Sequence, residues 1–331
     1  MLRTEVVSTG FYVPERVITN NDLTQWMETS DEWIRERSGI SERRWVDAGA
    51  GSSDLALEAA KQALDRAGLE ASDLDCLIVA TLSPDVYFPG SGVFLQRKLG
   101  ISGIPCLDVR NQCSGFIYGL SVADAWIRTG TYKRVLLVGA EVHSTGLEKT
   151  TEGRDTAVLF GDGAGAVVLS PIEDSGRGIL SVNIHADGKH AEKLWVKAPG
   201  SRYNPWLDAE QIESGLTRPV MEGREVFKHA AVRMPQAVKE VLAANGLTIE
   251  DVDLLIPHQA NQRITQAVQK SLGLPDEKVV SNIHKYGNTT AASIPIALHE
   301  AVEEGRIERG DLVCLTAFGS GFTWGAALIR W

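Results

Sequence analysis

Cys113 is the residue of this sequence best placed to act as a nucleophile. It lies in LDVRNQCSGF, between an apolar stretch over residues 104–109, which predicts a strand, and a helical pattern that runs through residues 120–130. At a helix N-terminus, unpaired N–H groups and the positive end of the helix dipole favour a thiolate over a thiol. A buried core cysteine is the structural alternative, and the local sequence does not choose between the two.

Two further polar residues stand at similar junctions. His258, in LLIPHQANQRI, follows an apolar stretch predicted as a strand, and α/β proteins place ligand-binding groups at such strand ends. The chain has 7 His, so a purely structural histidine is the alternative. Asn288, in YGNTTAAS, precedes a predicted helix, and taken alone it is best explained as a helix cap. Together, the three supply a nucleophile, a proton or hydrogen-bond partner, and an amide donor.

An internal repeat indicates how these residues come together. Residues 60–78 (AKQALDRAGLEASDLDCLI) and 238–256 (VKEVLAANGLTIEDVDLLI) match at a constant offset of 178 residues. Each copy predicts a helix, a glycine stop and a strand. A second repeat, of 120–130 with 295–305, has an offset of 175 and sets Cys113 opposite Asn288. We therefore expect two similar α/β halves, residues 1–172 and 173–331, related by a pseudo-twofold axis.

The composition is that of a globular protein with about two domains. The chain has 331 residues, of which 44% are hydrophobic and 23% charged. Its 33 Lys and Arg against 43 Asp and Glu give a net charge of -10, which argues against nucleic acid or an anionic membrane as partner. No apolar run reaches the ~18 residues of a membrane span. The start, MLRTEVVSTG, is unlike a signal peptide, so we expect a cytoplasmic protein.

The cysteine and glycine patterns exclude two kinds of site. The four cysteines have neither Cys-x-x-Cys nor zinc-type spacing, so the sequence indicates no metal. The glycines of FGDGAGAVVLS (160–170) lead into a predicted strand rather than a helix, which excludes a dinucleotide fingerprint and favours close packing or a tight turn. AFGSGFTWGAALIRW (317–331) is a second glycine turn, whose N–H groups either stabilise an oxyanion or serve packing alone. A polar stretch at 186–223 predicts a long excursion suited to substrate contacts.

The chain resembles β-ketoacyl-[acyl-carrier-protein] synthase III, the initiating condensing enzyme of type II fatty acid synthesis. The resemblance runs nearly end to end through TSDEWIRERSGI, DVRNQCSGF, FGDGAGA, GREVFK, PHQANQRI, YGNTTAAS and AFGSGFTWGAAL. It implies an α/β fold of the thiolase-like, duplicated αβαβα type. It also implies a homodimer that condenses an acyl-CoA, normally acetyl-CoA, with malonyl-acyl carrier protein and releases carbon dioxide. The product is a 3-oxoacyl-acyl carrier protein, and no cofactor is implied beyond the CoA thioesters themselves.

The resemblance assigns roles to individual residues. Cys113 becomes acylated, backbone N–H groups of Cys113 and Ser320 hold the oxyanion, and His258 and Asn288 stabilise the enolate. The matches to CoA contacts are Trp33, Arg37, Arg154, Arg224 and Asn261. The matches to the basic surface that meets the acidic carrier protein are Lys228, Arg263 and Lys270. The matches to the acyl pocket are Gln112, Phe88 and Phe318. In the family, the aromatic that Phe88 matches crosses the dimer interface and limits chain length.

Four residues depart from the family pattern: Gln112, Arg224, Tyr286 and Ser320. They stand where the typical enzyme has a small Ala, an Asn, a His and a Gly. Gln112 is larger than the usual neighbour of the nucleophile, and this leaves the acyl donor open. Relatives with Gln before the Cys, such as the alkylquinolone-pathway condensing enzyme, use other acyl and malonyl-type partners.

Two other functions are disfavoured. A thiolase needs a second cysteine near the C-terminal glycine turn, whereas the nearest one, Cys314, falls within a predicted strand. A non-catalytic partner subunit generally lacks the nucleophile, whereas this chain has Cys113, His258 and Asn288.

Overall fold

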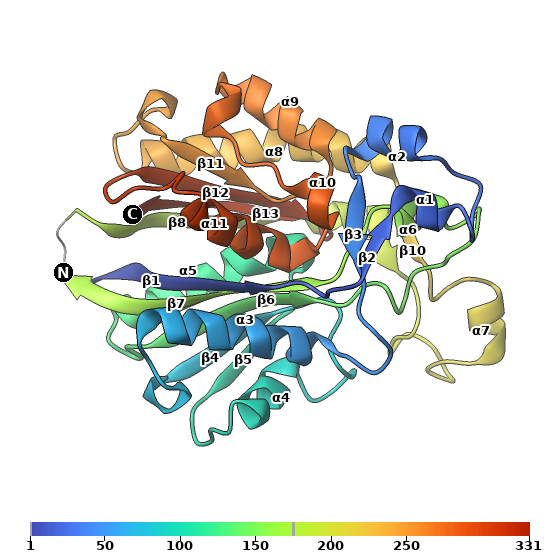
Figure 1. Ribbon diagram of the computed structural model, residues 1–331, viewed down its shortest axis with the longest axis horizontal. Coiled ribbons are helices and arrows are strands. Elements are labelled where there is room, and N and C mark those ends of the chain that lie inside the picture. Colours follow the sequence, from blue (N-terminus) through green and yellow to red (C-terminus); the bar gives the residue numbers. More distant parts are fainter. Residues whose placement is uncertain (1, 174–175) are drawn as a thin grey trace.

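The computed structural model describes residues 2–173 and 176–331. Two β-sheets lie face to face and alternate with three layers of helices (Figure 1). One outer layer contains α3 (Ser52–Ala67) and α4 (Ser91–Lys98). The middle layer contains α5 (Gly115–Arg128) and α11 (Ser293–Glu303). The other outer layer contains α8 (Gly223–Ala243) and α9 (Gln262–Leu272). This arrangement confirms the expected thiolase-like αβαβα fold.

The first sheet is built from the N-terminal part of the chain. Its strands, in spatial order, are β1 (Leu2–Tyr12), β7 (Gly163–Glu173), β6 (Val135–Glu141), β4 (Cys76–Ala80) and β5 (Cys106–Val109). β4 pairs in parallel with both β5 and β6, whereas β7 is antiparallel to β6 and to β1. The carboxyl ends of β4, β5 and β6 therefore meet at one edge of the sheet.

The second sheet repeats this topology. Its strands, in spatial order, are β8 (Gly178–Ala186), β13 (Thr323–Arg330), β12 (Leu312–Gly319) and β11 (Leu254–Pro257). β11 and β12 are parallel, and β13 is antiparallel to its two neighbours, as in the first sheet. A single parallel bridge between Leu255 and Val279 stands where β5 pairs with β4. The predicted duplication is thus confirmed, while the boundary at 172/173 stays a prediction; residues 174 and 175 of the expected break lie outside the described residues.

The middle layer carries most of the shared core. α5 buries Phe116, Ile117 and Leu120 between the sheets, and full burial of such side chains contributes about 1.5–3 kcal/mol each. The layers approach closely where glycine removes a side chain. A Cβ on Gly165 would lie 2.7 Å from the backbone nitrogen of Ile296 in α11. This contact supports the packing interpretation of the FGDGAG segment.

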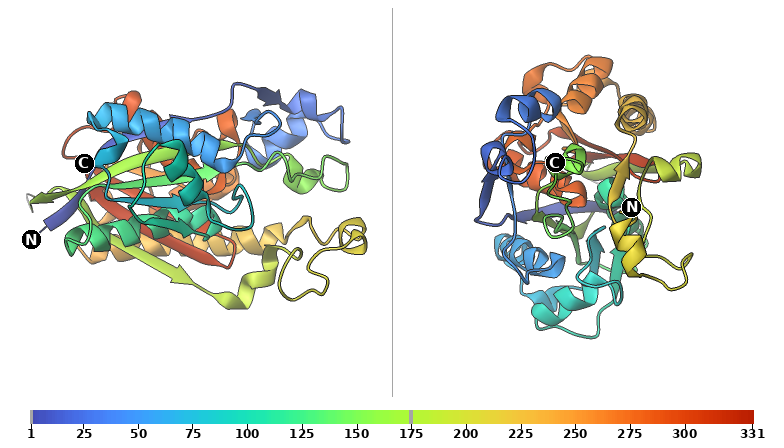
Figure 2. Two further views of the ribbon diagram at one scale, coloured as in Figure 1. Left: turned by 90° about the horizontal axis from the view of Figure 1, so that it is seen from below. Right: turned by 90° about the vertical axis from the view of Figure 1, so that its right-hand side faces the viewer.

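Smaller elements gather at the end of the molecule to which these strands lead. They are β2 (Val17–Thr19), α1 (Asn20–Leu23), α2 (Asp31–Ser38), β3 (Glu42–Arg44), α6 (Arg154–Ala157), β9 (Leu194–Val196), α7 (Ala209–Glu213), β10 (Pro219–Met221) and α10 (Ile283–Tyr286). Figure 2 shows the predicted excursion at 186–223 extending from this end. It is partly ordered, because β9 and β10 pair as an antiparallel ribbon.

Candidate active site

Cys113 lies at the junction that the sequence predicted, in a short 3₁₀ turn (Gln112–Ser114) between β5 and α5. Its side chain is only 8% exposed. The C-terminal glycine turn of the other half packs directly against it: a Cβ on Gly319 would lie 3.1 Å from the Cβ of Cys113. The two halves of the fold therefore meet at the candidate nucleophile, and a side chain at 319 would crowd it.

The ionisation of Cys113 differs from the expectation. Burial raises the pKa of the thiol to about 12, and the negative charge of nearby Glu141 acts in the same direction. The dipole of α5 opposes this shift but does not cancel the loss of solvation. The expectation of a thiolate in the free protein is therefore corrected, because the sequence could not reveal how deeply tertiary packing buries Cys113.

His258 follows β11 and is 2% exposed. Its Nδ1 lies 2.6 Å from Oγ of Ser293, which also accepts the N–H of Gln259 at 3.3 Å. The Ser293 hydroxyl proton can therefore point at Nδ1, which assigns the imidazole proton to Nε2. Nε2 is buried and has no partner in the described part of the chain. Burial also lowers the pKa of His258 to about 3, so the ring is neutral at physiological pH and presents one N–H donor.

Asn288 combines the two roles that its sequence context allowed. Its Oδ1 accepts the backbone N–H of Thr290 at 2.9 Å, as a capping residue does. Its own backbone N–H donates to the carbonyl of Leu159 at 2.8 Å. Among the described residues, Nδ2 donates to none. The cap fixes the carboxamide and leaves its N–H₂ group available to a ligand.

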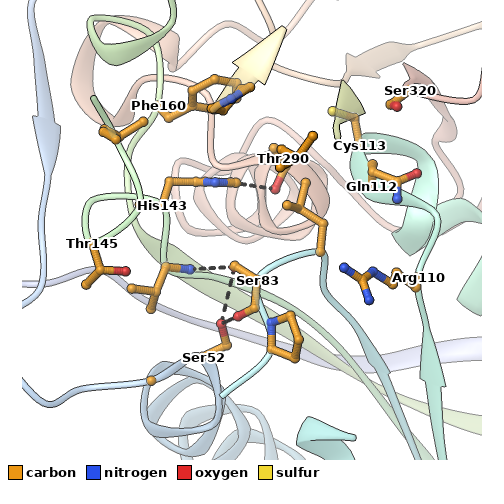
Figure 3. A pocket seen from close by; sticks show the side chains of 18 of the residues that line it. Ser52, Ser83, Arg110, Gln112, Cys113, His143, Thr145, Phe160, Thr290 and Ser320 are labelled. Carbon is orange, nitrogen blue, oxygen red and sulfur yellow. Dashed lines mark hydrogen bonds between the residues drawn. The ribbon is translucent and has the colours of Figure 1, made fainter. Parts of the chain in front are cut away.

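The three candidate catalytic residues share one cavity. A cavity of about 730 Å³ is lined by Cys113, His258 and Asn288, together with Phe318 and Gly319. We call it the entry cavity. A second cavity of about 600 Å³ is also lined by Cys113, together with Gln112 and Ser320 (Figure 3). We call it the acyl-side cavity. The predicted convergence of the two halves thus holds as geometry, and Cys113 lines both cavities.

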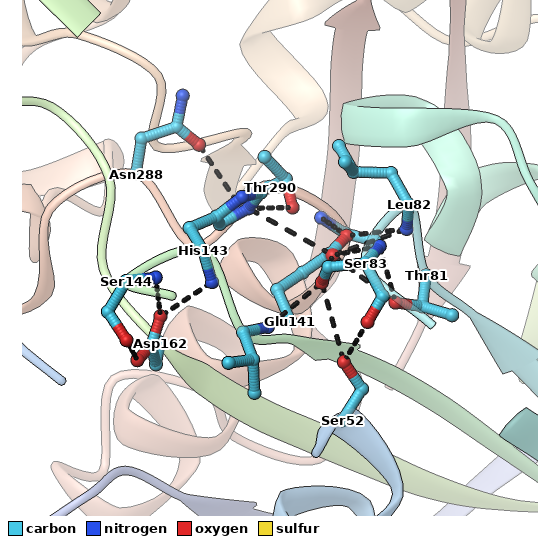
Figure 4. Close-up of polar contacts among 12 residues, drawn as sticks. Ser52, Thr81, Leu82, Ser83, Glu141, His143, Ser144, Asp162, Asn288 and Thr290 are labelled. Atoms are coloured by element: carbon cyan, nitrogen blue, oxygen red, sulfur yellow. Dashed lines mark hydrogen bonds and ion pairs between the residues drawn. The ribbon is translucent and has the colours of Figure 1, made fainter. Parts of the chain in front are cut away.

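Sequence reasoning missed a network of buried polar groups behind these side chains (Figure 4). Glu141, at the end of β6, accepts from Ser83 Oγ at 2.6 Å and from the backbone N–H of Ala291 at 3.4 Å. It thereby joins a loop of the first half to the segment that follows Asn288. Burial raises the pKa of Glu141 to about 7, against the lowering effect of these hydrogen bonds. The only signal in the sequence was a charged residue closing an apolar strand.

Asp162 of the FGDGAG segment is a second hidden acceptor. It receives the backbone N–H groups of Val46 (2.8 Å), His143 (2.7 Å) and Ser144 (2.9 Å), and the Ser144 hydroxyl at 2.5 Å. The carboxylate therefore ties its own segment to two others, at Val46 and at His143 and Ser144, beside the acyl-side cavity. The glycine pattern had suggested only close packing or a tight turn.

Residues that match CoA contacts form a second cluster at the mouth of the entry cavity. The guanidinium carbons of Arg37 and Arg154 lie 4.5 Å and 5.1 Å from the ring centre of Trp33. Arg224 and Asn261 line the entry cavity together with Arg37, and the side-chain amide of Asn261 donates to the Arg37 carbonyl at 3.0 Å. All five predicted residues therefore lie on one side of the site. An aromatic face with guanidinium groups is suited to an adenine ring and phosphates.

The three candidate docking residues are exposed. Lys228 lies on α8, and Arg263 and Lys270 lie on the neighbouring α9. Arg263 also lines the entry cavity and donates from Nε to the carbonyl of Glu36 at 3.1 Å. The positive charge is thus placed beside the opening.

The remaining predicted residues do not lie together in one cavity. Phe318 lines the entry cavity rather than the acyl-side cavity. Phe88 is 81% exposed and borders neither. Tyr286 turns away and donates to Glu300 at 2.6 Å. The Ser320 hydroxyl donates to the carbonyl of Leu194, whereas its backbone N–H has no acceptor among the described residues and is free to serve an oxyanion.

Other kinds of site find no support in the part of the chain that the structure describes. No group of three or more His, Cys, Asp or Glu there is placed to hold a metal ion. None of its helices has the length and apolar character needed to span a bilayer. Cys314 is buried in β12 and borders neither cavity next to Cys113, so the second cysteine of a thiolase has no counterpart there.

The duplicated fold and the cysteine–histidine–asparagine cavity are those of a thiolase-like condensing enzyme. Profiles of the family described as 3-oxoacyl-[acyl-carrier-protein (ACP)] synthase III match residues 107–188 and, for its C-terminal part, 242–331. Beta-ketoacyl-[acyl-carrier-protein] synthase III of Caldanaerobacter subterraneus is 48% identical over 326 residues, which cover 98% of this chain and 97% of the relative. That of Rhodospirillum centenum is 47% identical over 333 residues, covering 100% and 99%.

Two solved structures of this family have the same fold as this chain. The 3-oxoacyl-[acyl-carrier-protein] synthase III of Aquifex aeolicus superposes with a TM-score of 0.90 at 44% identity and covers 99% of this chain and 100% of its own. The Thermus thermophilus enzyme gives 0.91 at 42% identity, with 99% of both chains covered. The chain belongs to the β-ketoacyl-[acyl-carrier-protein] synthase III family. It is accordingly an acyltransferase of the condensing type, in the family that initiates fatty acid synthesis.

Proposed function

We propose that this protein condenses an acyl-CoA with malonyl-acyl carrier protein through an acyl-Cys113 intermediate. The observation that carries this assignment is the entry cavity, where Cys113, an unpartnered Nε2 of His258 and the free Nδ2 of Asn288 border one space. A nucleophile and two donors in one enclosed site suit a reaction that builds negative charge on a thioester oxygen.

The first half-reaction transfers the acyl group. The Cys113 sulfur attacks the thioester carbonyl of the acyl-CoA, and the backbone N–H groups of Cys113 and Ser320 hold the oxygen as it becomes negative. The carbon–sulfur bond to CoA breaks, and CoA leaves as a thiol with the proton that Cys113 gives up. Because burial raises the pKa of the free thiol to about 12, this proton departs only as the new bond forms.

The second half-reaction forms the carbon–carbon bond. The malonyl group enters the space that CoA vacated and loses carbon dioxide, and its two bonding electrons become an enolate. His258 Nε2–H and Asn288 Nδ2–H donate to the enolate oxygen. The enolate carbon attacks the acyl-Cys113 carbonyl, the sulfur leaves, and a proton from solvent restores the thiol. Both donors act on charge that is absent from the ground state, so they lower the barrier rather than hold the substrate.

The exposed residues fit the two carriers. Trp33, Arg37 and Arg154 would bind the adenine and phosphates of CoA, with Arg224 and Asn261 further along its arm. Lys228, Arg263 and Lys270 would attract the acidic carrier protein to a chain whose net charge is -10. We place the protein in the cytoplasm as a homodimer. Two features support the dimer: β5 is an edge strand, and Phe88 beside it in the fold is 81% exposed.

The test separates the half-reactions. The protein is incubated with acyl-CoA and examined by intact mass spectrometry, then supplied with malonyl-acyl carrier protein and assayed for the 3-oxoacyl product. An adduct on Cys113 that disappears when product forms supports the proposal. A product formed without a Cys113 adduct contradicts it.

A further inference from the structure

Two buried hydroxyl groups join the halves of the fold beside the proposed oxyanion donors. Oγ of Ser114 lies 2.7 Å from Oγ1 of Thr323, and the two residues are 0% and 9% exposed. Ser114 directly follows Cys113, whereas Thr323 begins β13 and stands three residues after Ser320. The hydrogen bond therefore links the chain segment of one proposed donor to the chain segment of the other.

Thr323 also holds the turn that carries Ser320. Gly319 ends β12 and pairs with Thr323, so residues 320–322 form the connection between the two strands. Oγ1 of Thr323 lies 3.0 Å from the carbonyl oxygen of Ser320 and donates to it. The hydroxyl of Ser320 in turn donates to the carbonyl of Leu194. Both the side chain and the carbonyl of Ser320 are thus bound, which restrains the direction of its backbone N–H.

The hydroxyl of Ser114 does not serve its own helix. Ser114 occupies the N-cap position of α5, where a serine side chain usually accepts a backbone N–H of the first turn. Within residues 2–173 and 176–331, its Oγ accepts no such bond. It lies instead 2.9 Å from the carbonyl oxygen of Asn111 and 2.7 Å from Thr323. Helix capping therefore does not account for the hydroxyl, whereas the bond between the two halves does.

The two donor segments also approach each other closely. A Cβ on Gly319 would lie 3.1 Å from the backbone nitrogen of Cys113 and 3.3 Å from that of Ser114. Two N–H groups stabilise an oxyanion only when both point at the position that the oxygen will occupy. Close packing keeps the segments near each other, but a hydrogen bond is directional and also fixes how they are turned.

We infer that Ser114 and Thr323 are positioning residues, which hold the backbone N–H groups of Cys113 and Ser320 in the relative orientation of an oxyanion site. This inference rests on the proposed function. Neither hydroxyl is among the described residues that line the entry cavity or the acyl-side cavity, so the pair acts through the backbone rather than on the substrate. Its effect should appear only where charge develops on the thioester oxygen, which is in the transition state.

The experiment measures single-turnover acylation of Cys113 at several concentrations of acetyl-CoA and of octanoyl-CoA, and uses the faster donor. In Ser114→Ala and in Thr323→Val, we expect the maximal rate to fall about tenfold while the half-saturating concentration is unchanged, because the lost interaction acts in the transition state alone. Thr323→Ser keeps the hydroxyl and should retain most of the rate. The double variant should slow by less than the product of the two single effects, since both single variants break the same bond.

Ser8→Ala is the matched control. Ser8 is 8% exposed, and its hydroxyl donates to the carbonyl of Ala63 at 2.6 Å, so this variant also loses a buried hydrogen bond. It should acylate Cys113 like the unaltered protein. An unchanged maximal rate in Ser114→Ala and Thr323→Val, or slowing explained by a higher half-saturating concentration, overturns the inference and leaves the proposed function intact. So does equal slowing by Thr323→Ser and Thr323→Val. Failure of the unaltered protein to form an acyl adduct on Cys113 overturns both.

Discussion

Oγ of Ser293 lies 2.6 Å from Nδ1 of His258 and fixes the side of the imidazole that faces away from the cavity. The serine is the first residue of α11, in the second half of the fold, and follows the short segment that carries Asn288. The start of this helix therefore orients the histidine directly, while the asparagine five residues earlier is held by the backbone N–H of Thr290.

Replacing Ser293 should impair condensation without stopping acylation. In Ser293→Ala, Nδ1 loses its partner, and the ring populates the tautomer in which Nε2 has no proton to donate. We expect condensation to slow about tenfold, the value of one hydrogen bond, while acylation of Cys113 is unchanged. Separate single-turnover measurements of the two half-reactions test this. Ser293→Thr keeps the hydroxyl and should restore most of the rate, whereas equal slowing of both half-reactions would show a merely structural role.

The buried histidines make stability depend on pH. Burial lowers the pKa of His258 to about 3, below its ordinary value of 6.5. The imidazole is therefore protonated near pH 6.5 in the unfolded chain but only near pH 3 in the folded chain. The free energy of unfolding is therefore unaffected by this histidine above pH 6.5. It falls as the pH decreases from 6.5 toward 3, by about 1.4 kcal/mol for each pH unit. His143, with a pKa lowered to about 4, acts in the same direction.

Glu141 opposes this trend, because a pKa raised to about 7 contributes stability that is lost as the pH rises from 4.5 through 7. The difference between the unaltered protein and His258→Gln isolates the histidine. Urea unfolding at several pH values between 6.5 and 4.5 should show the two free energies of unfolding approaching each other as the pH falls. Parallel curves would mean that folding does not lower the pKa of this imidazole.

Asp162 should contribute far more to stability than an exposed carboxylate. In Asp162→Asn, an N–H₂ group would face the backbone N–H groups of Val46, His143 and Ser144, and at least one donor would lose its acceptor. We expect a loss of about 3 kcal/mol in the free energy of unfolding. Asp65→Asn, at an exposed position of α3, is the control and should change it by less than about 0.5 kcal/mol. Similar values for the two variants would remove the structural role of Asp162.

The thiol pKa of Cys113 can be measured by alkylation. Because burial raises it to about 12, the thiolate fraction is small at neutral pH and increases about tenfold for each pH unit. The rate of alkylation by iodoacetamide should therefore rise through pH 6 to 8 without a plateau. The variant Cys113→Ala measures the alkylation of the other cysteines, which is the background rate. A plateau below pH 7 would mean that the dipole of α5 outweighs burial.

The sequence was sufficient to predict the layered fold and the meeting of Cys113 with His258 and Asn288. Both follow from the repeats, because equal elements in two halves place their strand ends together. The pKa of Cys113 was not predictable, since it depends on how deeply tertiary packing buries the thiol and on Glu141, which is distant in sequence. Ser293 gave no signal, because its context is an ordinary helix start.

The acyl-side cavity was also beyond sequence reasoning. Phe318 resembles an acyl-pocket residue in its motif, yet it lies within β12 and lines the entry cavity. His143 follows a buried strand and has no distinctive neighbours, so its place beside Thr290 emerges only from the fold. Gln112 was visible as a departure, but its direction into the cavity depends on a backbone conformation that no spacing reveals.

The most direct test of the three-residue site is a comparison of Cys113→Ala, His258→Ala and Asn288→Ala in the two half-reactions. Mass spectrometry after incubation with acyl-CoA should show no adduct on Cys113→Ala and a normal adduct on the other two. Condensation by His258→Ala and by Asn288→Ala should fall by roughly 10²–10³ for each lost donor. An acyl adduct on Cys113→Ala, or undiminished condensation without the histidine or the asparagine, would contradict the proposed mechanism.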